Sequence, residues 1–272
     1  MMPRPLPAAA GIFGWPVAQS KSPRIHRFWL GKLGIDGDYS RFPVHPDNLG
    51  AAIKALPAIG LRGVNVTMPH KAAVMAHLDD LDASARAVGA VNTVHVTAAG
   101  LIGHNTDVAG IAEPIARLVL AGRPIVILGA GGAARAALVA TRNLGATVTL
   151  VNRSADRAAA LLVELGIAGT VLSPAAPLPA AALLINATSL GMTGAPPLDI
   201  DLAPLANNAH VFDCVYAPLD TPLLQAARAR GLATIDGLAM LIGQAATAFT
   251  LFYGAPAPRQ FDAELRALLV EP

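Results

Sequence analysis

The sequence predicts an α/β protein of two domains, and three observations support this prediction. At 272 residues the chain can form two modest domains, each with its own apolar core. Short runs of β-branched and other apolar residues alternate with helical segments, which is the pattern of mostly parallel sheets. Near the middle, a glycine-rich turn separates a strand from a helix. We therefore predict an N-terminal α/β domain and a doubly wound parallel-sheet domain of the Rossmann type.

The first domain is predicted from the alternation that precedes the glycine-rich turn. Ser22 and Pro23 suit the cap and the first position of a helix, and Ala99 with Gly100 suits the turn of a hairpin. The expected elements are, in order, strand 11–14, helix 22–33, strand 39–44, helix 47–56, strand 64–67, helices 71–78 and 82–88, and strands 91–96 and 101–104. Helix 108–120 then leads into the second domain.

The second domain begins with a complete β-α-β unit. Residues 124–128 form a short apolar run, as expected of a parallel strand that is covered on both faces. The glycine-rich turn follows at once, and helix 133–144 and strand 146–151 complete the unit. Further elements are expected at strands 182–186 and 210–213, helix 222–230, strand 233–235 and helix 238–251.

The glycine-rich turn predicts a pyrophosphate site. Its glycines let the backbone approach the phosphates, and the helix that follows offers unpaired N–H groups and the positive end of its dipole. Ala134 replaces the third glycine of the motif, which the looser form of the motif allows. The predicted cofactor-binding residues of the turn are Gly129, Ala130, Gly131, Gly132 and Ala133.

The residues after the second strand of this unit predict a phosphorylated cofactor. An NAD-binding unit carries an acidic residue here, which accepts from the ribose 2′-hydroxyl. This chain instead has Asn152, Arg153, Ser154 and Arg157. With Ser154 as a helix cap, the two guanidinium groups can grip a phosphate dianion. We predict NADP(H) rather than NAD, the alternative being ordinary surface arginines with Asp156 as a local partner.

Composition excludes several other classes. Hydrophobic residues make up 54% of the chain and the mean hydropathy is +0.51, but much of this is alanine and no uninterrupted apolar run reaches the length of a membrane span. The net charge is +2 and no basic run is present, so neither a membrane nor a nucleic acid is an expected partner. No clear signal-peptide cleavage site is present, and the expected location is the cytoplasm.

A metal site is not expected either. The single cysteine, Cys214, cannot form an internal disulfide, and the seven histidines are scattered without zinc-ligand spacing. We interpret Cys214 as a small buried apolar residue.

A set of polar residues falls at the ends of predicted strands or the starts of predicted helices. Such a set suits a small ligand whose hydroxyls and carboxylate need fixed donors and acceptors, although each residue alone could be a cap, a loop contact or a surface charge. The set comprises Ser20, Ser22, Asn65, Thr67, Lys71, Asn92, Thr106, Asp107 and Gln244.

Lys71 is the leading candidate for proton transfer. Hydride exchange between a nicotinamide and a carbon that bears oxygen needs a proton donor or acceptor at that oxygen, and no histidine is well placed. At the start of a predicted helix the charge of Lys71 is unfavourable to the dipole, which makes a purely structural role less satisfactory. We expect the carboxylate of Asp107 to orient it.

Longer motifs resemble those of the shikimate dehydrogenase family. They occupy residues 14–26 (GWPVAQSKSPRIH), 65–71 (NVTMPHK), 89–93 (GAVNT), 103–107 (GHNTD), 186–192 (NATSLGM) and 236–241 (DGLAML). Because the match runs in order through nearly the whole chain, coincidence is far less probable than for the glycine-rich turn alone.

The resemblance implies reversible NADPH-dependent reduction of 3-dehydroshikimate to shikimate, a step toward chorismate and the aromatic amino acids. Lys71 and Asp107 would be the catalytic pair. Ser20 and Ser22 would hold the substrate carboxylate, with Tyr216 nearby. The ring hydroxyls would be bound by Asn65, Thr67, Asn92, Asp107 and Gln244, and the nicotinamide side would be lined by Asn186, Thr188, Met192, Gly237 and Met240.

The resemblance also implies a domain division. The C-terminal helices of this family return to the first domain, so residues 1–107 with 238–272 would bind substrate and residues 108–237 would bind NADP. The partner would be a small-molecule substrate, and the protein would be a monomer or a homodimer.

Three departures and three alternatives remain at this stage. Gln19, Ala239 and Ser154 stand where many relatives have histidine, glycine and threonine, and none of them removes a proposed catalytic group. One alternative is a broader enzyme that acts on quinate and shikimate. Another is a catalytically silent NADP-binding regulatory or scaffold protein. A third, another Rossmann enzyme, is opposed by the N-terminal signature.

Overall fold

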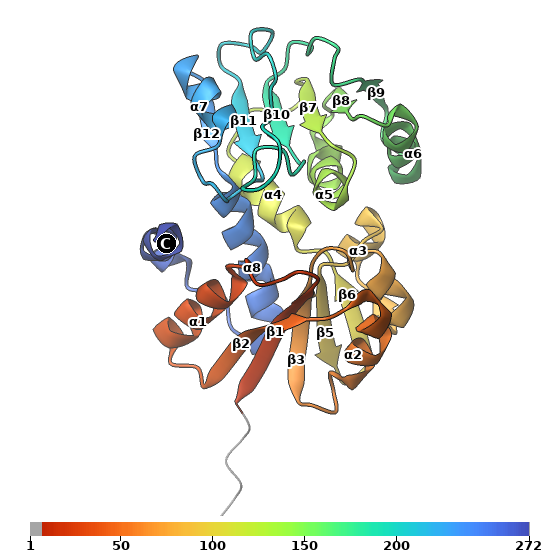
Figure 1. The fold of residues 1–272 in the computed structure, drawn as a ribbon, viewed down its shortest axis with the longest axis vertical. Coiled ribbons are helices and arrows are strands. Elements are labelled where there is room, and N and C mark those ends of the chain that lie inside the picture. Colours follow the sequence, from red (N-terminus) through yellow and green to blue (C-terminus); the bar gives the residue numbers. More distant parts are fainter. Residues whose placement is uncertain (1–6, 272) are drawn as a thin grey trace, which may run out of the picture. The chain divides into compact units, whose positions relative to one another are not determined.

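The computed structural model describes residues 7–271, and these form two compact units. Unit 1 combines the chain up to Thr106 with the chain from Gln244 onward, and unit 2 is Asp107–Gly243. Each unit is built on one six-stranded sheet. Figure 1 shows the strands of each sheet with the helices that flank them. The prediction of a two-domain α/β fold is confirmed. Among the described residues, no helix is long and apolar enough to cross a membrane.

Unit 1 contains a mixed sheet in the order β2-β1-β3-β5-β6-β4. β1 pairs in parallel with β2 and β3, whereas β5 is antiparallel to both β3 and β6. The strands are β1 Ala8–Gly14, β2 Gly37–Pro43, β3 Leu61–Val66, β4 Asp80–Leu81, β5 Thr93–Thr97 and β6 Gly100–His104. The helices are α1 Ser22–Leu33, α2 Leu49–Ala55, α3 Ala83–Val88, the later part of α8 Gly237–Tyr253, and α9 Asp262–Val270.

Two apolar clusters cover the two faces of this sheet. Successive side chains of a strand point to opposite faces, so the neighbours Ile12 and Phe13 in β1 belong to different clusters. On the face of Ile12, Phe252 from α8 packs against Tyr39 from β2. The other face is covered by α2 through buried residues such as Ile53. Residues from beyond unit 2 in the sequence therefore complete the core of unit 1.

Unit 2 contains a fully parallel sheet in the order β12-β11-β10-β7-β8-β9. The strand order reverses between β7 and β10, which is the topological switch point of a doubly wound sheet. The strands are β7 Ile125–Leu128, β8 Val148–Val151, β9 Gly169–Leu172, β10 Leu183–Asn186, β11 His210–Asp213 and β12 Ala233–Ile235. The helices are α4 Asp107–Ile115, α5 Gly132–Thr141, α6 Ala155–Leu165, α7 Pro222–Ala229 and the first turns of α8.

Several element predictions were wrong in detail. Residues 71–78 do not form an α-helix, because only a 3₁₀ helix, Ala73–His77, is present there. The predicted helix 108–120 is α4, which ends at Ile115, one residue after Pro114. Proline has no N–H to continue the helical ladder, which accounts for the early end.

The start of α1 also differs from the prediction. Lys21 holds the cap position without a side-chain hydrogen bond, and Ser22 is the first helical residue. The Ser22 N–H instead donates to Ser20 Oγ at 3.3 Å. A serine oxygen therefore accepts from the first N–H of the helix, but it belongs to Ser20 and not to Ser22, the serine that we had expected to cap the helix.

Candidate active site

Buried polar side chains gather at one end of the unit 1 sheet. They come from the loop after β1, the start of α1, β2, the ends of β3 and β6, the start of β5, and α8. These positions adjoin because β3, β5 and β6 pair through Asn65, Thr93 and His104. We call this set the polar chain. It comprises Ser20, Ser22, Tyr39, Asn65, Thr93, Asn92, Thr106 and Gln244.

The polar chain begins with the two predicted carboxylate-binding serines. Ser20 Oγ donates to Ser22 Oγ at 3.2 Å. Burial raises the pKa of Tyr39, and the neighbouring Ser22 hydroxyl opposes this rise. Arg41 Nε donates to the Ser20 carbonyl at 2.9 Å and so fixes the loop that carries the first serine. Both serines are buried.

The middle of the polar chain is the side-chain amide of Asn65. Tyr39 Oη donates to Asn65 Oδ1 at 2.6 Å. Asn65 Nδ2 donates to Thr93 Oγ1 at 2.8 Å and to the Asn92 carbonyl at 3.3 Å. Buried amides need such partners, because an unpaired one loses its hydration without compensation. The orientation of the Asn65 amide is therefore set by its neighbours.

The polar chain ends at the helix that returns from unit 2. Thr93 Oγ1 donates to Asn92 Oδ1 at 3.0 Å, and Asn92 Nδ2 donates to Thr106 Oγ1 at 3.0 Å. The Thr106 N–H also donates to Asn92 Oδ1, at 2.8 Å. Thr106 Oγ1 lies 3.5 Å from Gln244 Oε1, to which it can donate. The structure thus brings Asn92 and Gln244, 152 positions apart in the sequence, into one network.

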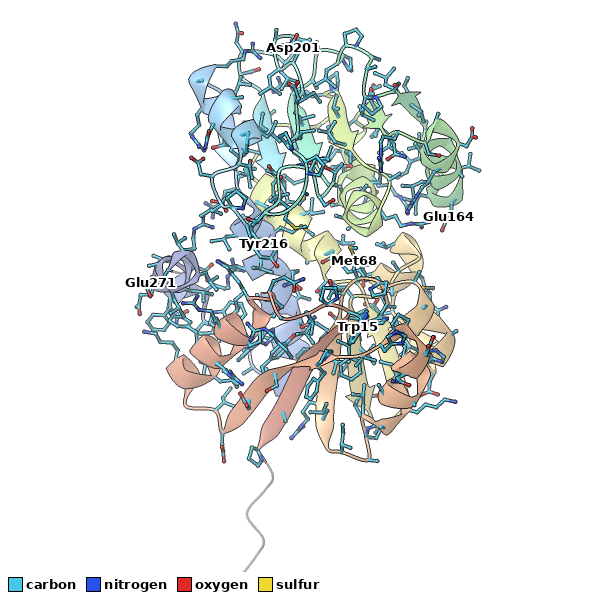
Figure 2. The ribbon with its side chains drawn as sticks, viewed as in Figure 1. Trp15, Met68, Glu164, Asp201, Tyr216 and Glu271 are labelled. Atoms are coloured by element: carbon cyan, nitrogen blue, oxygen red, sulfur yellow. The ribbon has the colours of Figure 1, made fainter. Side chains whose placement is uncertain are left out.

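The loop after β3 carries the other predicted residues of unit 1. Its N-terminal residue Thr67 donates its N–H to the Phe13 carbonyl at 2.9 Å, and the Trp15 N–H donates to the Met68 carbonyl at 3.0 Å. Trp15 and Met68 are 47% and 75% exposed, and Figure 2 labels both. The loop after β1 and the loop after β3 are therefore tied to each other by backbone bonds.

Lys71 is half-buried, in the turn that follows this loop. The Val91 N–H donates to its carbonyl at 2.9 Å, which joins the Lys71 turn to the segment before β5. Asp107 is buried at the first position of α4. The catalytic pairing of Lys71 with Asp107 stays a prediction.

In unit 2, the glycine-rich turn has the backbone that the motif requires. Gly129 has φ of 103°, and a Cβ there would lie 3.0 Å from Thr188 Cγ2 and 3.2 Å from the Ala187 carbonyl oxygen. Gly131 occupies the cap of α5, and the space around its missing side chain is open to at least 4 Å. The first N–H groups of α5 therefore have no side-chain cap, which suits an anion.

The arginine segment lies at the start of α6. Ser154 Oγ accepts from the Arg157 N–H at 3.3 Å, so the predicted helix cap is confirmed. Asn152 Nδ2 donates to the Ser154 carbonyl at 2.9 Å. Arg153 and Arg157 are exposed, and within residues 7–271 neither of them forms an ion pair with Asp156 or another carboxylate. Both guanidinium groups are therefore available to an anionic ligand.

The segment after β10 is held by a buried carboxylate that sequence reasoning missed. Asp213 Oδ1 accepts from Asn186 Nδ2 at 2.9 Å, and its Oδ2 accepts from Thr221 Oγ1 at 2.7 Å. Asn186 Oδ1 in turn accepts from Thr188 Oγ1 at 2.7 Å. Burial raises the pKa of Asp213 despite these hydrogen bonds. The carboxylate fixes the rotamer of Asn186, and Asn186 fixes the loop that carries Thr188.

The remaining predicted residues of unit 2 lie after β11, in the loop after β10 and at the start of α8. A Cβ on Gly237 would lie 2.3 Å from the Val215 carbonyl oxygen, so only glycine fits where α8 begins. Tyr216, labelled in Figure 2, is half-buried, and this burial raises its pKa. Met192 is 44% exposed and Met240 is half-buried.

Cys214 packs against the apolar core beside β11. Burial and the carboxylates of Asp213 and Asp107 raise the pKa of its thiol. A neutral thiol in this setting behaves as a small apolar side chain. Across the described part of the chain, no group of three or more histidine, cysteine or acidic residues could hold a metal ion.

Comparison with known proteins gives consistent results. Residues 12–94 match the family described as the shikimate dehydrogenase substrate binding domain. A shikimate dehydrogenase (NADP(+)) of Sphingopyxis alaskensis is 55% identical over 264 residues, 96% of each chain.

Two solved structures are also similar. One is shikimate 5-dehydrogenase from Thermus thermophilus in complex with NADP(H) and shikimate, with a TM-score of 0.85 and 35% identity over 96% of this chain and 99% of that chain. The other is quinate dehydrogenase from Corynebacterium glutamicum in complex with NAD, with a TM-score of 0.87 and 31% identity over 96% and 99%. On its sequence, its two folded units and its near full-length relatives, the chain belongs to the shikimate dehydrogenase family.

Proposed function

We propose that this chain is an NADP-dependent shikimate dehydrogenase, which reversibly reduces 3-dehydroshikimate to shikimate. The observation that carries the proposal is the polar chain of unit 1. It places the serines suited to a carboxylate beside the buried, hydrogen-bonded amides suited to ring hydroxyls. A small acid with several hydroxyls is the ligand class that such a network suits. The product belongs to the route toward chorismate and the aromatic amino acids.

Lys71 moves the proton in this proposal. When bound, NADPH supplies the hydride that reduces the carbonyl carbon. The ammonium of Lys71 donates its proton to the carbonyl oxygen, so that the C=O becomes CH–OH and Lys71 is left neutral. In the oxidative direction the neutral amine accepts the proton. Asp107 anchors the lysine and a ring hydroxyl.

The other residues of unit 1 orient the substrate. Ser20 and Ser22 bind its carboxylate, with Tyr216 of unit 2 contributing near the same group. The ring hydroxyls are bound by Asn65, Thr67, Asn92, Asp107 and Gln244. On this basis unit 1 is the substrate domain, close to the predicted 1–107 with 238–272.

Unit 2 is the cofactor domain of the proposal, close to the predicted 108–237. The open N-terminus of α5 and the space at Gly131 support a pyrophosphate there. The unpaired Arg153 and Arg157 support a 2′-phosphate. The nicotinamide would be lined by Asn186, Thr188, Met192, Gly237 and Met240. The enzyme would act in the cytoplasm, as a monomer or a homodimer.

A second candidate is an enzyme of broader specificity that also oxidises quinate. The structural similarity to a quinate dehydrogenase in complex with NAD favours keeping this candidate. The arginines after β8 argue against NAD as its cofactor. A silent NADP-binding protein is a weaker candidate, because it would have no use for Lys71 and Asp107, both of which are present.

The deciding experiment follows nicotinamide reduction by the purified protein. Shikimate and quinate are each tested with NADP and with NAD. Activity confined to shikimate with NADP supports the proposal. Appreciable turnover of quinate favours the broader enzyme, and absence of activity in all four pairings favours the binding protein.

A further inference from the structure

Tyr39 is a fully buried residue that lies outside every motif of the sequence. Its hydroxyl lies between the serine part of the polar chain and the amide part. It donates to Asn65 Oδ1 at 2.6 Å, and the Ser22 hydroxyl is its neighbour on the serine side.

The hydrogen bonds around Tyr39 run in one direction. A tyrosine hydroxyl has a single proton, and here that proton goes to Asn65 Oδ1. The Tyr39 oxygen is left as an acceptor on the side of Ser22, and Ser22 Oγ itself accepts from Ser20 Oγ at 3.2 Å. The direction of donation at Asn65 is thus set by Tyr39.

This direction determines what Asn65 can offer to a ligand. Both protons of Asn65 Nδ2 are directed at protein acceptors, Thr93 Oγ1 at 2.8 Å and the Asn92 carbonyl at 3.3 Å. The Oδ1 atom has two lone pairs, and Tyr39 uses one of them. Asn65 therefore faces a ligand as an acceptor, and it selects a hydroxyl that donates.

The ring of Tyr39 is held rigidly. His26 stacks on it with ring centroids 4.0 Å apart and an interplanar angle of 11°, and Phe252 packs at 6.4 Å. His26 is fully buried, and burial lowers its pKa to about 3, so the stacked ring is neutral at physiological pH. A rigid ring places the Tyr39 hydroxyl at a constant position relative to Asn65.

We propose that Tyr39 is a positioning residue for the substrate: it fixes Asn65 as an acceptor for a ring hydroxyl. The inference rests on the proposed function. It assigns a role to a residue that never touches the substrate, because Tyr39 acts through Asn65.

The test is Tyr39→Phe, which keeps the stacked ring and removes only the hydroxyl. Loss of one hydrogen bond that orients a binding group should raise the KM for shikimate about two- to tenfold. The KM for NADP should not change, and kcat should change less than the KM for shikimate. A residue that merely stabilises the fold would not produce this split.

Tyr253→Phe is the matched control. Tyr253 belongs to the same aromatic cluster, with its ring 6.0 Å from His26, and its hydroxyl donates to the Asp38 carbonyl at 3.0 Å. Tyr253→Phe also removes one hydroxyl from the aromatic cluster, but that hydroxyl bonds to Asp38 and not to Asn65. All kinetic constants should stay at the wild-type values, and a rise in the KM for shikimate equal to that of Tyr39→Phe would overturn the proposal.

A double-mutant cycle tests the route through Asn65. If Tyr39 acts through Asn65, adding Tyr39→Phe to Asn65→Ala should raise the KM for shikimate no further. The proposal is contradicted if the two substitutions raise the KM for shikimate independently, so that their separate effects multiply in the double variant.

If the wild-type enzyme oxidises shikimate while the KM of Tyr39→Phe for shikimate is unchanged, only the role of Tyr39 fails. If the wild-type enzyme has no such activity, the proposed function fails as well.

One measurement needs no variant that could misfold. Shikimate analogues in which one ring hydroxyl at a time is replaced by fluorine keep an acceptor but lose the donor. For one fluorinated analogue, the KM of the wild-type enzyme should exceed the KM for shikimate by at least as much as the KM for the corresponding deoxy analogue does. The reason is that fluorine cannot donate to Asn65 Oδ1. Full retention of affinity by every fluorinated analogue would show that Asn65 does not act as an acceptor.

Discussion

Lys71 is half-buried, and a residue outside its own turn holds its main chain. The Val91 N–H donates to the Lys71 carbonyl, and this bond does not depend on the Lys71 side chain. Lys71→Ala should therefore fold normally and lower turnover about a hundredfold or more, as expected on loss of a proton-transfer group. Steady-state kinetics should show nearly unchanged KM values for shikimate and NADP. Lys54→Ala, an exposed lysine of α2, is the control, and unchanged turnover in Lys71→Ala would remove this residue from the mechanism.

His26 should make the stability of the protein depend on pH. Its pKa is lowered from 6.5 to about 3 by burial, and both ring nitrogens are buried without a hydrogen-bond partner. The unfolded chain binds a proton near pH 6.5 that the folded chain excludes, so this stability is complete above pH 6.5 and is lost as the pH falls toward 3. The slope is about 1.4 kcal/mol per pH unit.

Denaturant unfolding between pH 7.5 and pH 4.5 measures this slope. Burial raises the pKa values of the neighbouring Tyr39 and Tyr253, so neither titrates in that window. His26→Phe keeps an aromatic ring and removes the titration. Its free energy of unfolding should fall less steeply on acidification than that of the wild type, and equal slopes would contradict the assignment.

At the scale of single residues, the sequence allowed part of the site to be predicted. Ser20, Asn65 and Asn92 were predicted because they lie in long and particular motifs, and the structure includes them in the polar chain together with the predicted Gln244. Tyr39 was not found, because a tyrosine in a strand is an ordinary core residue until its hydroxyl partner is known. Hydrogen bonds between segments distant in the chain depend on strand pairing and register, which no single motif contains.

The start of α6 is the element on which cofactor choice depends. Arg153 and Arg157 flank its cap, where the N–H groups and the helix dipole also favour an anion. Replacing both arginines by alanine should raise the KM for NADP about tenfold or more, because each charge-assisted bond to the 2′-phosphate is lost. The KM for NAD should stay unchanged, since NAD lacks that phosphate. Kinetics with both cofactors give the comparison.

The control for this element is Arg228→Ala in α7. Arg228 is an exposed arginine that pairs with Asp220, so its loss removes one positive charge elsewhere in unit 2. It should leave both cofactor constants unchanged. An equal rise in the KM for NADP would mean that net charge, rather than the α6 site, attracts the cofactor.

Among the elements, the central strands were predictable, whereas two of the edge strands, β4 and β9, were not. β7 and β8 are buried along their whole length, so they appear in the sequence as continuous apolar runs. β9 is an edge strand with two exposed residues, and it lies beside a proline-rich segment. β4 has only two residues, Asp80 and Leu81. Short or half-exposed strands depend on pairing with a neighbour, and local sequence carries little sign of it.

At the scale of the whole molecule, unit 2 is formed by one continuous segment of the chain, whereas unit 1 is formed by two separate segments. Both apolar clusters of unit 2 are made only of residues between Val108 and Met240. We expect a fragment of residues 107–243 to fold and to bind NADP alone. A fragment of residues 1–106 lacks Ala248 and Phe252, which cover Tyr39 and Ile12, and it should not form a stable core.

Circular dichroism, thermal unfolding and NADP titration of the two fragments test this expectation. A cooperative unfolding transition should occur in 107–243 and be missing in 1–106. Adding a peptide of residues 244–271 to the fragment 1–106 is the control, since it restores the missing part of the core. A cooperative transition in 1–106 alone would contradict the expected dependence on α8.

The discontinuity of unit 1 has a consequence for protein synthesis. A ribosome completes all of residues 107–243 before it reaches the part of α8 that packs on β1 and β2. During that interval the aromatic face around Tyr39 stays uncovered on the nascent chain, although its own residues were translated early. Unit 2 can therefore finish folding first, and unit 1 becomes whole only when Gln244, Phe249 and Phe252 have left the exit tunnel. Chaperones that hold exposed aromatic surface would act on this chain during that period.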